Sequence, residues 1–121
     1  ANIYQTYIGA AQGSGDLAIS HLAKAITLDP TNPKLRLQMG ILYYNLKDKE
    51  QAIKLINQAI ELKTNWDVPY LNLYKIYLDG NDLQKAQVVL KKAVELTSTT
   101  SENYEKLQQE LVSLTEKLSK K

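Results

Sequence analysis

Residues 32–66 read NPKLRLQMGILYYNLKDKEQAIKLINQAIELKTNW, and this stretch repeats itself in both directions along the chain. Four apolar positions in its second half recur 34 residues later and, more weakly, 34 residues earlier. The set Ala52, Ile56, Ala59 and Leu62 returns as Ala86, Leu90, Ala93 and Leu96, and is preceded by Ala18, Leu22, Ala25 and Leu28. Self-similarity at this period indicates a helical repeat array in which each unit is a pair of helices.

The composition limits the classes of function. With 121 residues, 44% of them hydrophobic, the chain is long enough for one domain with a core. A formal net charge of only +2, without a dense basic tract, argues against a nucleic-acid partner. The absence of cysteine excludes a disulfide framework and a thiolate metal site. No apolar run approaches the roughly 20 residues of a membrane-spanning helix, so no membrane insertion is expected of this segment.

The compartment stays open at this level. The chain begins at Ala1 without methionine and shows no signal peptide, so we interpret it as a processed product or an excised piece of a longer protein. A chain without cysteine is compatible with a cytoplasmic and with an extracytoplasmic location.

The first repeat is expected to be the least regular. Residues 2–12 predict a short helix, and residues 13–16 predict a turn because glycine lowers the cost of non-helical dihedral angles. A second helix is expected over residues 17–28, where one apolar stripe recurs at helical spacing, and Pro30 ends it.

Capping residues mark the helices of the second repeat. Asn32 is a natural N-cap and Pro33 a natural first helical residue, for a helix that runs to about Leu46. Asp48, with Gln51 three residues later, predicts a capping box for the partner helix, which runs to about residue 62.

The third repeat follows the same plan. Asp67 is expected to cap its first helix, residues 80–82 to form the turn, and residues 83–96 to form the partner helix. After the polar run of residues 97–101, a last helix is predicted over residues 102–117.

This pattern resembles the tetratricopeptide repeat family. Met39 and Gly40 are similar to the family's large-then-small pair, which lets the two helices of one repeat approach closely. The family's aromatic position falls on Tyr43, and its second-helix positions fall on Ala52, Ile56 and Ala59. In the third repeat the same roles fall to Leu73, Tyr74, Tyr77, Ala86, Leu90 and Ala93.

The resemblance implies an all-α, right-handed solenoid of antiparallel helix pairs with about seven helices, forming one domain over residues 1–121. Its repeats would span residues 1–31, 32–65 and 66–99, followed by a capping helix at residues 101–119. Gln108 stands where a small residue would receive a further helix, which favours the capping role. Tyr74 in place of a small residue predicts that the third helix pair is splayed or repacked.

The tyrosines suggest where a ligand would bind. All eight lie in first-type helices or in the last helix, and in this family the first helices line the concave face. We therefore predict an apolar groove with a few amide groups, suited to an amphipathic helix or an extended peptide. Tyr7, Tyr44 and Asn45 are the better functional candidates, whereas Tyr43, Tyr70 and Tyr77 are read as core spacers. The predicted groove set is Ile3, Tyr4, Tyr7, Leu37, Gln38, Ile41, Tyr44, Asn45, Leu71, Asn72, Lys75 and Leu78.

The last helix carries a second candidate surface. Five apolar residues follow the 3-4-3-4 spacing of a coiled-coil seam over about two heptads. They either continue the packing against the preceding helix or mediate self-association into a homo-oligomer. These residues are Tyr104, Leu107, Leu111, Leu114 and Leu118.

The sequence gives little support for a carboxylate clamp, for catalysis or for metal or cofactor binding. The family's clamp for a C-terminal carboxylate needs cations, and its positions here read Ile3, Tyr7, Gln38, Val68 and Asn72. His21, the only histidine, lies beside Leu22 without a partner for catalysis and is interpreted as a surface residue. We find no catalytic residues, no metal-ligand cluster and no need for a cofactor.

The preferred function is therefore a non-enzymatic scaffold that binds a protein or peptide segment in its concave groove. The main alternative is a structural module that self-assembles through its terminal helices. A third hypothesis is a tail, built from such repeats, of a larger bacterial membrane or envelope protein.

Overall fold

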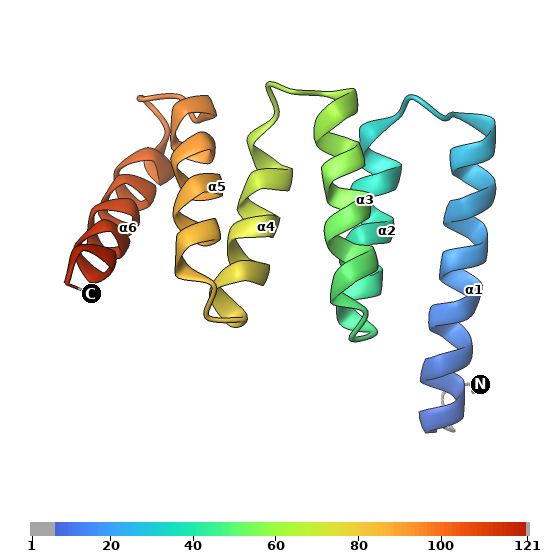
Figure 1. Ribbon diagram of the computed structural model, residues 1–121. Coiled ribbons are helices and arrows are strands. Elements are labelled where there is room, and N and C mark those ends of the chain that lie inside the picture. The colour runs from blue at the N-terminus through green and yellow to red at the C-terminus, as the bar shows by residue number, and fades with distance from the viewer. Residues whose placement is uncertain (1–6, 121) are drawn as a thin grey trace. The chain divides into compact units, whose positions relative to one another are not determined.

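The computed structural model describes the backbone of residues 7–120 and the side chains of residues 15–120, and this part of the chain consists of α-helices and the turns that join them. Six helices follow one another, joined by short connections (Figure 1). They are α1 (Tyr7–Leu28), α2 (Pro33–Asn45), α3 (Lys49–Leu62), α4 (Asp67–Asp79), α5 (Leu83–Leu96) and α6 (Glu102–Ser119). Within the described range, no helix has both the length and the apolar character that crossing a bilayer requires.

The helices group into two compact units, one ending at Leu62 and the other beginning at Lys63. The first unit contains α1, α2 and α3, and the second contains α4, α5 and α6. The assignment of the whole chain to one domain stays a prediction, and so do the repeat boundaries.

The core of the first unit is built where α2 packs against α3. Ala52, Ile56 and Ala59 of α3 are fully buried, as the repeat pattern predicts for a small–large–small face. On α2, Gly40 allows the close approach: a Cβ atom there would lie 2.8 Å from Cγ1 of Ile56 and 3.1 Å from the carbonyl oxygen of Ala52. The large-then-small pair, Met39 and Gly40, is buried at this contact.

Asn32 and Asp48 cap the helices of the second repeat as expected, but the capping box is only half formed, because the backbone N–H of Asp48 bonds to the carbonyl of Tyr43 at 2.9 Å. The Asn32 side chain accepts a hydrogen bond from the backbone N–H of Lys34 at 3.0 Å. At the start of α3, the Asp48 carboxylate accepts from the backbone N–H of Gln51 at 3.2 Å. Each bond satisfies a backbone donor that the first turn of a helix leaves without a partner.

The turns α2–α3 and α4–α5 have the same construction. The residue after each C-cap is left-handed, with φ 72° at Lys47 and φ 60° at Asn81. The backbone N–H of the following residue then bonds to the carbonyl of Tyr43 at 2.9 Å in the first turn and of Tyr77 at 2.8 Å in the second. This is the Schellman arrangement that closes many helices, although neither left-handed residue is a glycine.

The predicted turn at residues 13–16 is wrong, because α1 runs through it without a break. Glycine makes a turn inexpensive, but it costs a helix only about 1 kcal/mol per residue and does not end it. Gly15 is buried beside Leu46: a Cβ atom there would lie 2.9 Å from Cδ2 of Leu46. The two helices expected in the first repeat are therefore one, apart from residues 2–6, which lie outside the described part.

Because α1 is one continuous helix, the face that carries its repeat positions is less buried than the matching faces of α3 and α5. Ala18, Leu22 and Ala25 are only half-buried. The matching residues of α3 and α5 are 0% exposed, because a first-type helix packs on each of those faces.

The second unit has a core shared by three helices. It is formed by a cluster of buried residues on α5 and α6, against which side chains of α4 pack. The buried members are Ala86, Leu90, Val94, Leu107 and Leu114.

Tyr74 is repacked within this unit. Its ring packs against the cluster from α4, while Ala86, Leu90 and Ala93 stay fully buried. The tyrosine at the small position therefore does not open the α4–α5 pair, and of the two predicted outcomes it is repacking that occurs.

The helix starts of the second unit differ in one respect from the prediction. Trp66, not Asp67, is the N-cap of α4, and it makes no side-chain capping bond. Asp67 lies in the first turn, where its carboxylate accepts a hydrogen bond from the Thr97 hydroxyl at 3.3 Å. Ser101 caps α6 by accepting from the backbone N–H of Asn103 at 3.2 Å.

Candidate functional site

The predicted groove residues of the first unit divide between core and surface. Leu37 is 6% exposed and belongs to the core, whereas Ile41 is 36% exposed. Gln38 and Asn45 are exposed and Tyr44 is half-buried. The surface of α2 therefore offers an apolar residue, an aromatic residue and two amides.

In the second unit, the predicted groove residues lie along α4. Lys75 is exposed and Leu78 is 41% exposed. The Asn72 amide donates to the carbonyl of Val68 at 3.0 Å, so this donor is used within the helix. Leu71 packs partly against the α5–α6 cluster. Ile3 and Tyr4 lie outside the described residues, as does the side chain of Tyr7.

A pocket of about 270 Å³ lies between α4 and α6, and we refer to it as the α4–α6 pocket. Its apolar part is formed by Leu71, Leu107 and the ring of Tyr74, of which Leu107 is buried and the other two are partly buried. Polar residues complete the lining: Asp67, Thr97, Ser101, Asn103, Lys106 and Glu110.

The electrostatics of the α4–α6 pocket centre on Tyr74. Burial raises the pKa of its phenol, and the nearby Glu110 carboxylate raises the pKa further. The hydroxyl therefore stays protonated at neutral pH and can act as a hydrogen-bond donor. The pocket thus offers a neutral phenol, carboxylates and an apolar surface, which is chemistry for binding a ligand.

Sequence reasoning placed only Leu71 of this lining in the groove, and it missed Tyr74, Asp67 and Glu110. The available signal was the tyrosine itself, which stands 34 residues after Gly40 at a position expected to be small. A bulky side chain does not fit where a small residue is expected, so it must extend to another part of the structure. In the structure Tyr74 borders the α4–α6 pocket.

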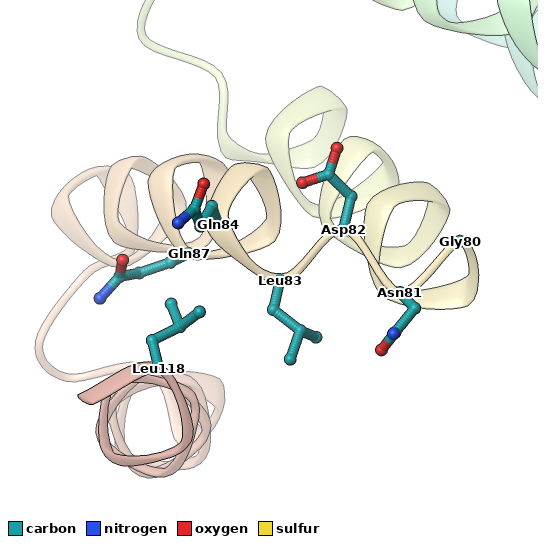
Figure 2. Close-up of a pocket in the computed structure, with 7 residues that line it drawn as sticks. All are labelled: Gly80, Asn81, Asp82, Leu83, Gln84, Gln87 and Leu118. Carbon is teal, nitrogen blue, oxygen red and sulfur yellow. The ribbon is translucent and has the colours of Figure 1, made fainter. Parts of the chain in front are cut away.

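A second depression, of about 550 Å³, lies at the opposite end of α5. Figure 2 shows Leu83 of α5 and Leu118 of α6 extending into it beside the α4–α5 turn. Two of its polar side chains form hydrogen bonds within the chain: Asp82 accepts from the backbone N–H of Lys85 at 3.3 Å, and Gln87 donates to the Thr115 hydroxyl at 3.0 Å.

The proposed seam of the last helix lies against α5. Leu107 and Leu114 are buried in the cluster, and Tyr104, Leu111 and Leu118 pack partly against it. The structure therefore shows all five residues in contacts within the chain. Self-association through them stays a prediction. It would require α6 to replace these contacts within the chain by equivalent contacts with a second copy.

The remaining candidates can be placed briefly. His21 is exposed on α1, as expected of a surface residue. Among the described residues, no three His, Asp or Glu side chains converge in a way that could hold a metal ion.

The repeat period and the paired helices define this chain as a helical repeat protein. The family model for the tetratricopeptide repeat matches residues 10–74, which is more than half of the sequence. The chain therefore belongs to the tetratricopeptide repeat family.

Two relatives share part of the sequence. BBSome complex member BBS4 of Bos taurus is 31% identical over 90 residues, which cover 74% of this chain and 17% of that protein. The uncharacterized protein ycf37 of Porphyra purpurea is 32% identical over 66 residues, covering 54% of this chain and 38% of that protein. The chain thus spans well under half the length of either relative.

Two solved structures share the fold. The first tetratricopeptide repeat domain of Spaghetti (RPAP3), bound to the HSP90 peptide SRMEEVD, matches with a TM-score of 0.70 at 24% identity, over 90% of this chain and 85% of that one. The translocator chaperone SycD of Yersinia enterocolitica type III secretion matches with a TM-score of 0.74 at 16% identity, over 90% and 77%. The predicted all-α fold class is confirmed, with six helices in the described residues against about seven expected.

Proposed function

We propose that the chain is a non-enzymatic protein-interaction module that binds a peptide or helical segment along its first-type helices. Membership of the tetratricopeptide repeat family supports a role in protein interaction. The observation that carries the finer proposal is the α4–α6 pocket, where an apolar surface opens between two helices and is rimmed by polar groups. Apolar anchors with a polar rim are what peptide-binding surfaces generally provide.

A peptide would also need an exposed apolar contact beside the pocket. Leu78 supplies one on α4, the same helix that contributes Leu71 and Tyr74 to the lining. The carboxylate clamp of the family is not part of this proposal, because none of its positions here, Gln38, Val68 and Asn72 among them, holds a cation.

The experiment is a selection of random twelve-residue peptides, displayed on phage, against the immobilised chain. Peptides that bind should lose at least about tenfold in affinity when Leu78→Asp places a charge on the first-type helix. The matched control is Val88→Asp, which changes an equally apolar and even more exposed residue (68%) on the second-type helix α5. Equal losses in both variants, or no enriched peptide at all, would contradict the proposal.

A further inference from the structure

The α4–α6 pocket carries more negative than positive charge. Asp67 contributes a carboxylate from the first turn of α4, and Glu110 contributes one from α6. Both are half-buried, and neither forms an ion pair with another residue in the described part of the chain. Lys106 is the one cation of the lining, and it is exposed, so its ammonium group is well solvated.

The apolar part of the pocket suits a long, flexible side chain. Leu71 and Leu107 present aliphatic surface, and Tyr74 presents an aromatic ring beside them. The methylene stem of a lysine or arginine packs well on such surfaces while its charged end reaches a polar rim. An aromatic face adds a favourable contact for a cation. At about 270 Å³, the pocket lies below the roughly 300–1,000 Å³ typical of drug-sized ligands, which favours a single side chain as occupant.

The charges of the lining suit such an occupant, since the lining contains two carboxylates, Asp67 and Glu110, and one cation, Lys106. The Glu110 carboxylate contributes to the raised pKa of Tyr74, which means that a negative charge on the phenol is opposed there. A carboxylate of a ligand would meet the same opposition from Asp67 and Glu110.

We infer that the α4–α6 pocket receives a basic side chain of the bound segment, with its stem on Leu71, Tyr74 and Leu107 and its charge toward Asp67 and Glu110. The inference rests on the proposed function, because it names the chemistry of the partner for that same surface. The partner is a protein segment in which an arginine or lysine adjoins an apolar residue, the latter for the contact at Leu78.

The test uses the same random twelve-residue peptide library and the whole chain. Enriched sequences should contain arginine or lysine next to an apolar residue more often than the unselected library does. Their affinity should fall about tenfold with Glu110→Gln, which removes the charge and keeps the shape of the side chain. It should also fall as salt is added. Glu105→Gln is the matched control, since Glu105 is an exposed glutamate of the same helix outside the pocket lining.

The outcomes separate the two proposals. Basic peptides that lose affinity in Glu110→Gln but not in Glu105→Gln support the inference. Acidic or neutral peptides that bind through Leu78 overturn the inference and leave the proposed function standing. Basic peptides that respond equally to both glutamine variants overturn the assignment to this pocket. If no peptide is enriched, the proposed function fails and the inference fails with it.

Discussion

Gly40 and Tyr74 occupy the same place in successive repeats and have opposite effects on their surroundings. Gly40 allows α2 to pack closely against Ile56 of α3. The Tyr74 side chain instead packs against the α5–α6 cluster and lines the α4–α6 pocket. At this one position of the repeat, the first unit holds a residue that only closes its helix pair, and the second holds a side chain that also lines a pocket.

Gly40→Ala should destabilise the fold by about 1–3 kcal/mol, because the added methyl group would overlap the Ile56 side chain and the backbone of α3. The measurement is urea denaturation followed by circular dichroism. Gly80→Ala is the control: Gly80 is exposed, and its φ of −87° is open to alanine, so a change within about 0.5 kcal/mol is expected there. Comparable losses in both variants would contradict the close packing at Gly40.

Tyr74 should make the stability of the second unit fall at alkaline pH. Its pKa is raised in the folded state by burial and by Glu110, above the usual value of 10.0. The stabilisation is therefore fully present below pH 10 and is lost as the pH rises through the folded-state pKa. Denaturation series between pH 8 and pH 11 should show a shallower alkaline decline for Tyr74→Phe than for the parent chain. A decline that is unchanged in Tyr74→Phe would assign the effect to other groups.

At the scale of elements, much of the helix plan could be predicted from the sequence. The bounds of α5 and the caps Asn32 and Asp48 follow from local signals, namely apolar periodicity and side chains that bond to nearby N–H groups. The continuous helix α1 could not be predicted in this way. The sequence around Gly15 is compatible with a turn and with close packing, and in the structure Gly15 packs against Leu46, which is distant along the chain.

The candidate site was harder to predict because it also depends on contacts between residues that are distant along the chain. Leu71, which the sequence assigned to the groove, lines the α4–α6 pocket, but that pocket depends on how α6 packs against α4 and α5. Glu110 raises the pKa of Tyr74 only because this packing brings the two residues together, and the periodicity of the sequence does not predict that packing.

The packing of α6 has its own test. Leu114→Ala should cost about 2–4 kcal/mol, since Leu114 is 5% exposed within the α5–α6 cluster. Val112→Ala on the same helix should stay within about 0.5 kcal/mol, because Val112 is 55% exposed. Both are measured by thermal or urea unfolding, with light scattering to record mass. If Leu114→Ala left stability intact and instead lowered the mass of an oligomer, the seam would be an interface between copies.

At the scale of the whole molecule, the repeat architecture separates two tasks. The second-type helices α3 and α5 supply fully buried small–large–small faces, and the first-type helices α2 and α4 keep exposed residues such as Ile41 and Leu78 beside buried ones. In a repeat array, residues outside the stacking faces can be substituted without loss of the fold. Family membership therefore accounts for the architecture, and in our proposal individual side chains such as Tyr74 and Glu110 select the partner.

The most direct test of this account is amide chemical-shift mapping of the chain with a peptide enriched from the library. The account predicts shifts concentrated on α4 and α6 around the α4–α6 pocket, including the amides of Leu71, Tyr74 and Glu110. Shifts confined to the outer surface of α5 around Val88, or shifts only on the α4–α5 turn near Leu83, would contradict it.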